Sequence, residues 1–288
     1  MRVAMVSAGL HGVGYAISEV LREGQYRVSV STTQTPENVE AVNAPWLTHH
    51  GDLTVSGDSA HWVDKVMQEW GRIDLLVNNL GPYLWDYPTI AQTETRDWNF
   101  VLQTNLTVAF ELTKAVVPIM RRQGGGAIIN LGFVGAGTDQ GWALRGAYAV
   151  AKSGLASLTR TIALEEQRHG ITCAMVCPSD IRGASKESWT PPVEEKPYRD
   201  PIGYDVARVV VFLADPLSRN LSGNVIELAP RLSSDEPTIG DTVWVAPLAM
   251  HGVITDIRQE SGQPLYLIHP ALGESAWYPL IQLQSPHN

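Results

Sequence analysis

The chain contains only two cysteines among its 288 residues, Cys173 and Cys177. Both lie in the apolar run ITCAMVCP, which predicts a strand. On an extended strand, a separation of four residues places both side chains on one face but roughly 13 Å apart, beyond the reach of a disulfide bond. We therefore expect two buried, reduced thiols, which are typical of a cytoplasmic protein.

Positive charge is also scarce, because 21 Lys and Arg face 30 Asp and Glu, for a formal net charge of −9. This balance argues against a nucleic-acid partner, since nothing offsets the repulsion from a phosphate backbone. No apolar run approaches the ~18 residues of a membrane span, and the N-terminal stretch MRVAMVSAGL is too short for a signal peptide. We expect neither a nucleic-acid partner nor a membrane partner.

Apolar residues make up 44% of the chain and follow an alternating pattern. Up to about residue 230, short β-branched runs alternate with amphipathic stretches, which is typical of βαβ units. We predict an α/β fold with a doubly wound, Rossmann-like parallel sheet. The predicted strands are Arg2–Ser7, Arg27–Ser31, Ile73–Asn78, Ala127–Leu131, Ile171–Cys177 and Asn224–Leu228. The predicted helices are Val13–Arg22, Ser59–Trp70, Arg96–Arg121, Tyr148–Arg168 and Asp205–Ala214.

Two segments depart from this alternation. Residues 182–203 contain four prolines and mixed charge, so we predict a loop there. Residues 230–288 contain short alternating runs punctuated by Gly and Pro, which predict a small antiparallel, β-rich module. The module resembles SH3-like barrels in a general way only. We therefore divide the chain into domains of residues 1–229 and 230–288.

A glycine-rich turn joins the first predicted strand to the first predicted helix, in VAMVSAGLHGVGYAISEVL. Gly9, Gly12 and Gly14 allow the backbone to approach a pyrophosphate closely. The helix N-terminus near Val13 supplies unpaired N–H groups and a partial positive charge. At the first strand–helix junction of a βαβ chain, such a turn predicts a dinucleotide site.

The order of the motifs that follow resembles that of the short-chain dehydrogenase/reductase family over residues 1–229. The family's TGxxxGxG corresponds to SAGLHGVG, in which Ala8 stands at the first glycine position. NNLG is similar to the family's NNAG, and VLQTNLTVAFELT carries the family's active-site asparagine at Asn105. The strongest motif is YAVAK, the family's YxxxK, which contributes Tyr148 and Lys152.

The resemblance implies an NADP(H)- or NAD(H)-dependent oxidoreductase. A four-residue separation puts Tyr148 and Lys152 on one face of a helix. A phenol has an unperturbed pKa of about 10, so it needs a nearby cation to exchange protons near neutral pH. By resemblance, Tyr148 is the general acid/base, Lys152 lowers its pKa and holds the nicotinamide ribose, and Asn105 orders a water for proton relay. Hydride is then exchanged with a small organic substrate beneath the 182–203 loop.

The resemblance also assigns cofactor contacts. Asn78 and Asn79 are expected to brace neighbouring strands by side-chain hydrogen bonds. Asp52 corresponds to an adenine-contacting aspartate, and a helix-flanking cap is the alternative. The predicted cofactor-binding residues are Ser7, Gly9, His11, Gly12, Val13, Gly14, Thr32, Thr33, Asp52, Leu53, Asn79, Gly81, Lys152, Pro178 and Ile181.

Cofactor preference depends on the end of the second predicted strand. NAD-preferring members place an acidic residue there, which binds the adenosine ribose and repels a 2′-phosphate. This chain has the sequence STTQ at residues 31–34, with no acid. His11 stands where NADP-dependent members often carry a basic residue. We predict that NADP(H) is favoured over NAD(H).

One departure concerns the family's catalytic serine. Aligned on Asn130, the stretch INLGFVGAG places Phe133 at the serine position. Phenylalanine cannot donate a hydrogen bond to a substrate carbonyl, and Thr138 is an alternative hydroxyl. Three hypotheses therefore stay open: reduction or oxidation of a carbonyl/alcohol pair, the same chemistry on an activated C=C or an imine, and a dinucleotide-binding sensor or scaffold with little catalysis.

Other features concern partners and metals. In the resembling family, the helices that carry Asn105 and Tyr148 form the main subunit contact, and both have apolar stripes here, so we expect a homodimer or homotetramer. Four aromatic residues fit a substrate wall and a subunit contact equally well: Tyr83, Trp85, Tyr87 and Trp142. Three histidines lack partners at metal-ligand spacing, so we expect no metal and interpret them as surface or core fillers: His49, His50 and His61.

Overall fold

The computed structural model describes residues 1–35, 46–82, 84, 88–138, 141–142, 144–178, 203–228, 242–245, 250–260, 263–270, 275–279 and 283–284. These residues belong to two compact units, one up to Leu228 and one from Thr242 onward. The domain boundary predicted at residues 229–230 lies outside the described residues and stays a prediction. None of the helices in the described ranges combines the length and the hydrophobicity that a membrane span needs.

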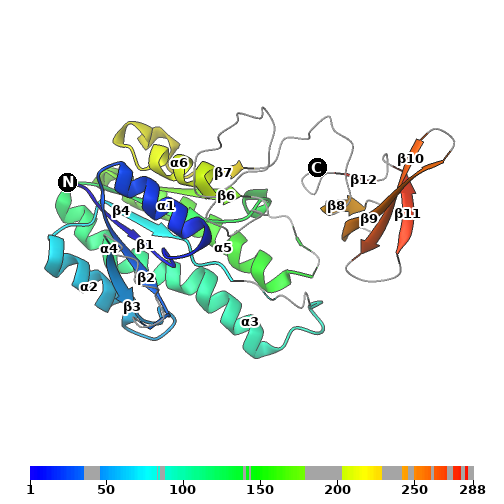
Figure 1. The fold of residues 1–288 in the computed structure, drawn as a ribbon. Coiled ribbons are helices and arrows are strands. Elements are labelled where there is room, and N and C mark those ends of the chain that lie inside the picture. Colours follow the sequence, from blue (N-terminus) through cyan, green and yellow to red (C-terminus); the bar gives the residue numbers. More distant parts are fainter. Residues whose placement is uncertain are drawn as a thin grey trace. The chain divides into compact units, whose positions relative to one another are not determined.

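The first unit is built on one parallel sheet of seven strands in the order β3-β2-β1-β4-β5-β6-β7 (Figure 1). This confirms the predicted doubly wound, Rossmann-like sheet. The chain turns from one half of the sheet to the other between β1 and β4, the kind of position where ligands bind in such folds. The strands are β1 (Val3–Val6), β2 (Arg27–Thr32), β3 (Leu47–His50), β4 (Leu75–Asn78), β5 (Gly126–Leu131), β6 (Ile171–Pro178) and β7 (Val225–Leu228).

Strand β3 is the one strand of this sheet that the sequence analysis missed. It is four residues long, lies at the edge of the sheet and ends in two histidines, so it has no apolar run. In β6, Cys173 and Cys177 are buried and free, as predicted. Burial raises the pKa of both thiols, so neither is a thiolate at neutral pH.

Helices cover both faces of the sheet. On one face, α1 and α6 pack around residues such as Ile17 and Val210. On the other face, α2, α4 and α5 pack around residues such as Trp62, Leu112 and Ile162. The main helices are α1 (Gly12–Glu23), α2 (Asp58–Trp70), α3 (Thr95–Leu102), α4 (Val108–Gln123), α5 (Gly146–Glu166) and α6 (Gly203–Leu213).

The single helix predicted over Arg96–Arg121 is wrong in one respect. The helix is continuous, but a π-helical segment, Gln103–Thr107, separates α3 from α4. Asn105 lies at the centre of this segment, and its Nδ2 donates to the backbone oxygen of Val101 at 3.0 Å. A side chain that hydrogen-bonds a carbonyl four residues back competes with the regular ladder, which accounts for the wider turn.

The second unit is a small antiparallel sheet of five strands in the order β11-β10-β9-β8-β12. This confirms the predicted β-rich module, whereas its likeness to SH3-like barrels stays a prediction. The last strand pairs with the first, with Leu283 opposite Val245. The strands are β8 (Thr242–Val245), β9 (Met250–Glu260), β10 (Gln263–Pro270), β11 (Ala276–Pro279) and β12 (Leu283–Gln284).

Candidate functional site

Lys152 is a charged side chain in the core of the first unit, with only 1% of its surface exposed. Its Nζ donates to the backbone oxygens of Leu131, at the end of β5, and Leu80, just after β4, at 2.9 and 3.2 Å. The same Nζ lies 5.5 Å from the centroid of the Tyr148 ring, one helical turn earlier on α5. Burial lowers the pKa of Lys152 to about 8, which brings its titration close to neutral pH.

Asn105, on the π-helical segment, lies near the same stretch of backbone after β4 as Lys152. Its Nδ2 donates to the backbone oxygen of Pro82 at 2.8 Å as well as to that of Val101. Its Oδ1 is buried and has no hydrogen-bond partner among the described residues. A Cβ built on Gly81 would lie 3.3 Å from Lys152 Nζ and 3.7 Å from Asn105 Oδ1. The structure therefore brings together three residues that the sequence analysis assigned to the site, namely Lys152, Asn105 and Gly81.

The ends of β1 and β4 are joined by side-chain hydrogen bonds. Ser7 Oγ accepts from the backbone N–H groups of Asn79 and Leu80, at 2.8 and 3.2 Å, and donates to the backbone oxygen of Val77. Asn79 Nδ2 donates to the backbone oxygen of Ser7 at 3.0 Å. Leu80 therefore connects two parts of the site, because its N–H meets Ser7 and its carbonyl meets Lys152.

The bracing role predicted for the two asparagines is confirmed. Asn78 Nδ2 donates to Asn130 Oδ1 at 2.8 Å, across β4 and β5, and Asn130 Nδ2 donates to Thr159 Oγ1 on α5. Ser7 was predicted to contact the cofactor, but the residue is 1% exposed and its hydroxyl already makes three hydrogen bonds within the protein.

The glycine-rich turn uses its three glycines differently. Gly12 has a φ of +51°, and a Cβ there would meet no atom within 4 Å. A Cβ on Gly14 would lie 2.3 Å from the backbone oxygen of Ala8, and one on Gly9 would lie 2.5 Å from Val30. Gly12 therefore supplies an unusual backbone conformation on an open side, whereas Gly9 and Gly14 allow close packing. Helix α1 begins there with no side-chain cap and no acidic residue in its first turn, which leaves its N–H groups for an anion.

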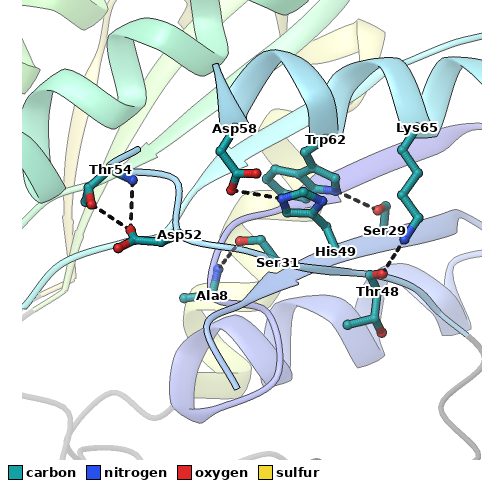
Figure 2. Close-up of polar contacts among 10 residues, drawn as sticks. All are labelled: Ala8, Ser29, Ser31, Thr48, His49, Asp52, Thr54, Asp58, Trp62 and Lys65. Atoms are coloured by element: carbon teal, nitrogen blue, oxygen red, sulfur yellow. Dashed lines mark hydrogen bonds and ion pairs between the residues drawn. The ribbon is translucent and has the colours of Figure 1, made fainter. Parts of the chain in front are cut away.

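Ala8 itself has a φ of +51°, in the left-handed region that favours glycine. Its backbone N–H donates to Ser31 Oγ at 3.1 Å (Figure 2). Ser31 is buried near the end of β2. A serine hydroxyl on the neighbouring strand thus holds the turn at the position where the resembling family has its first glycine.

The end of β2 offers hydroxyl groups but no carboxylate. Thr32 is buried, and its Oγ1 accepts from the backbone N–H of Gln34 at 3.1 Å. Thr33 and His11 are exposed, and Val13 is half-buried at the start of α1. Of these predicted cofactor contacts, Thr33 and His11 are the accessible polar ones.

Asp52 lies in the loop between β3 and α2. Its Oδ1 accepts from both the backbone N–H and the Oγ1 of Thr54, at 2.9 and 2.7 Å (Figure 2). Asp52 therefore caps a turn inside the loop, and the suggested helix-flanking cap is wrong, because Gly57 is the N-cap residue of α2. Leu53 is buried and packs among the apolar residues of α2, so it is a core contact.

His49 has a definite partner, which the interpretation of the histidines as fillers missed. Its Nε2 lies 3.0 Å from Asp58 Oδ2, and its ring stacks on Trp62 with centroids 5.9 Å apart (Figure 2). The spacing of His49 and Asp58 carries no motif that could have revealed the pair. No group of three or more potential metal ligands occurs among the described residues.

Phe133 lies beside Tyr148, and its correspondence to the family's serine position stays a prediction. The ring centroids of Phe133 and Tyr148 are 6.0 Å apart, and Trp142 contacts both rings at centroid distances of 6.0 Å or less. The Arg145 guanidinium lies 5.4 Å from the Phe133 ring centroid. The alternative hydroxyl, that of Thr138, donates to the backbone oxygen of Gly135. The ring of Tyr148 is thus bordered by two aromatic rings.

Several predicted features fall outside the described residues, namely Ile181, most of the 182–203 loop, Tyr83, Trp85 and Tyr87. Pro178 is described and is buried at the end of β6. Within the described residues, two observations fit a dinucleotide: the uncapped start of α1 beside Gly12, and the buried, unpartnered Asn105 Oδ1 near Lys152 Nζ. The first can hold a phosphate, and the second can accept a hydrogen bond beside Gly81.

Comparisons with known proteins agree with this geometry. Residues 8–228 match the family described as enoyl-(acyl carrier protein) reductase. An oxidoreductase by name, YtkK of Bacillus subtilis, is 40% identical over 244 residues, which cover 79% of this chain and 94% of that protein. The 3-oxoacyl-(acyl-carrier-protein) reductase FabG of Vibrio cholerae is 30% identical, with 79% and 95% covered. A solved structure from Bacillus thuringiensis, described as a 3-oxoacyl-reductase, is 39% identical with a TM-score of 0.72 and 79% and 96% covered.

Proposed function

This chain belongs to the short-chain dehydrogenase/reductase family, and we propose that it is an NADP(H)-dependent oxidoreductase that transfers hydride to or from a small organic substrate. Membership of the family implies a nicotinamide dinucleotide cofactor. The observation that carries the proposal is the meeting of Lys152, Asn105 and Gly81 one helical turn from Tyr148. Two carbonyls and a buried amide hold these groups in place, which is what preorganised proton transfer needs.

In this proposal each residue has a separate task. Tyr148 exchanges a proton with the substrate, and the Lys152 ammonium favours the phenolate by its charge. An ammonium has three donors, and two of those on Lys152 meet Leu80 and Leu131, so a third is left for a ribose hydroxyl. Asn105 Oδ1 accepts from a water that returns protons to the site. When bound, the cofactor supplies or accepts the hydride.

Preference for NADP(H) is supported by the end of β2. No carboxylate stands at residues 31–34 to repel a 2′-phosphate, whereas Thr33 and His11 are exposed. Titration of the chain with NADPH and NADH, followed by quenching of tryptophan fluorescence, is expected to show tighter binding of NADPH. The variant Thr33→Asp is the matched control, because an acid there should weaken NADPH binding more than NADH binding. Equal affinities in the wild type, or tighter NADH binding, would contradict this preference.

The proton-transfer role is tested by Tyr148→Phe. We expect this variant to lose hydride transfer and to keep its NADPH affinity, because the ring and its contacts remain while the proton donor is gone. Single-turnover NADPH oxidation against a panel of ketones, enones and imines measures the first quantity, and fluorescence quenching measures the second. An unimpaired rate in the variant would remove Tyr148 from the reaction.

One observation favours a second candidate function. The aromatic border formed by Phe133 and Trp142 has no hydroxyl to polarise a carbonyl oxygen. Reduction of an activated C=C or an imine depends less on such a donor, and a sensor or scaffold does not depend on it at all. The same substrate panel separates these readings, since enone or imine turnover supports the first and NADPH binding with no turnover supports the second.

We also propose a cytoplasmic homodimer or homotetramer. The exposed apolar side chains of Phe100, Phe110 and Val150, on α3, α4 and α5, support a subunit contact on these helices. The two free, buried thiols support a reducing compartment. Light scattering at micromolar concentration is expected to give at least the dimer mass, and a monomer would contradict the proposed assembly.

A further inference from the structure

The loop of residues 51–57 carries Asp52 and is tied together at its two ends. His49 precedes it on β3, and Asp58 follows it as the first residue of α2. The 3.0 Å contact between His49 Nε2 and Asp58 Oδ2 therefore joins the two ends of the loop (Figure 2). We call this contact the His49–Asp58 clip.

The loop backbone passes directly against the clip. A Cβ built on Gly51 would lie 2.4 Å from Asp58 Oδ2 and 2.6 Å from His49 Nε2, so any side chain there would displace the pair. The Gly51 N–H donates to the backbone oxygen of Thr32 at 2.9 Å. The start of the loop is thus fixed between the clip and the end of β2.

Backbone hydrogen bonds connect the clip to Asp52. The N–H of Asp58 donates to the oxygen of Val55 at 3.1 Å, and the N–H of Val55 donates to the oxygen of Asp52 at 2.9 Å. Asp52 Oδ1 in turn holds Thr54. A shift of Asp58 would therefore be passed to Asp52 through two consecutive turns.

The histidine end of the clip is buried. His49 is 4% exposed and stacks on Trp62, which is fully buried. Trp62 Nε1 donates to Ser29 Oγ at 2.9 Å, which attaches α2 to β2 (Figure 2). Because His49 is packed in this way, it offers Asp58 a well-defined hydrogen-bond partner.

We propose that the His49–Asp58 clip positions Asp52 for the adenosine half of the dinucleotide, an inference that rests on the proposed function. His49 and Asp58 touch no ligand in this scheme and are positioning residues. They act by holding the Asp52 carboxylate in its binding position before the dinucleotide arrives, which reduces the entropy lost on binding.

The test is isothermal titration calorimetry of the full chain with NADPH and with adenosine 5′-monophosphate, which carries only the adenosine end. We expect Asp58→Ala to weaken the binding of both ligands about tenfold. His49→Phe keeps an aromatic ring on Trp62 but loses Nε2, so it should weaken the binding of both ligands by a similar factor. Asp58→Asn retains an oxygen that can accept a hydrogen bond from His49 and should restore most of the affinity. Thermal melts confirm that each variant is folded.

Lys65 provides a matched control. Its Nζ donates to the backbone oxygen of Thr48 at 2.8 Å and thus also ties α2 to β3, but away from the loop (Figure 2). Lys65→Met should leave both affinities unchanged. Because the clip acts through Asp52, Asp58→Ala should have little further effect in an Asp52→Ala background.

The outcomes separate the two proposals. If the wild-type chain binds no NADPH, the proposed function is overturned. If it binds NADPH and both Asp58→Ala and His49→Phe bind as tightly, the clip is not a positioning element. An undiminished effect of Asp58→Ala in the Asp52→Ala background, or an equal loss in Lys65→Met, would also overturn the inference.

Discussion

The ring of Phe133 lies edge-on to the ring of Tyr148, with centroids 6.0 Å apart and planes at 72°. An aromatic edge at this point fills space beside the phenol but donates no hydrogen bond to an oxygen. Under the proposed function, Phe133 would therefore add no second donor to the proton that Tyr148 supplies.

Phe133→Ser is expected to raise ketone reduction about a hundredfold, because a donor aimed at a developing oxyanion is worth roughly 2.7–4 kcal/mol. Loss of a half-buried aromatic ring should also cost up to about 3 kcal/mol of stability. Steady-state rates and thermal melts measure the two effects separately. Phe133→Ala is the control, since it removes the ring and adds no donor. A wild type that already reduces ketones rapidly, with a slower Phe133→Ser, would show that another donor serves the site.

Ala8→Gly should stabilise the fold by about 1 kcal/mol, because Ala8 has a φ of +51° that glycine adopts without strain. Chemical denaturation measures the change. Ala16→Gly, at a buried position in the interior of α1, is the control and should destabilise by about 1.5 kcal/mol, because it adds backbone freedom and removes a buried methyl group. Loss of stability in Ala8→Gly would mean that the alanine methyl group makes contacts that outweigh its backbone strain.

Lys152 should make stability rise with pH in alkaline solution. Burial lowers its pKa from 10.5 to about 8, so between these values the unfolded chain binds more protons than the folded chain. By linkage, the free energy of unfolding of the wild type should rise over this range, relative to Lys152→Met, by roughly 3 kcal/mol. Urea denaturation of both proteins from pH 7 to 10.5 tests the prediction, and a constant difference between them would contradict it.

Glu166 should also make stability rise with pH, but in the acid range. Hydrogen bonds from Arg121 lower the pKa of the Glu166 carboxyl below its unfolded value, and Arg121 Nε donates to Oε2 at 2.7 Å. The stabilisation is therefore present above about pH 4.3 and is lost as the pH falls through the lower, folded pKa.

Arg121→Met is expected to destabilise the chain at pH 7 and to have progressively less effect toward pH 3, as Glu166 becomes protonated. Guanidinium denaturation at the two pH values measures this change. Arg22→Met is the control, because its pair with Glu19 is exposed on α1 and should be worth under about 0.5 kcal/mol. A cost for Arg121→Met that does not shrink in acid would mean that packing of the Arg121 stem, and not its charge, is responsible.

The sheet and the shared helix face of Tyr148 and Lys152 could be predicted from sequence because both rest on local patterns. Strands β1, β4 and β6 are continuous apolar runs, and Tyr148 and Lys152 are one helical turn apart. Strand β3 could not be predicted in this way. It is only four residues long, beginning at Leu47, and an edge strand needs few apolar side chains. The π-helical turn at Asn105 was not predicted either, because the apolar residues of α3 and α4 have the spacing of one continuous helix.

Pairs brought together by the fold leave no periodic trace. His49 and Asp58 are nine residues apart across a strand end and a loop, and Arg121 and Glu166 are 45 residues apart on two helices. Each residue alone has the ordinary character of a surface side chain. Only the packing of α2 on β3, and of α4 beside α5, defines these contacts.

The strand order has a consequence for how the chain is made. Every strand after the first pairs with a strand that precedes it in the sequence: β2 and β4 with β1, β3 with β2, and β5, β6 and β7 each with the strand before. In the second unit β12 likewise returns to β8. During synthesis on a ribosome, each new strand thus emerges to a partner already present, and the sheet can grow outward without waiting for later sequence.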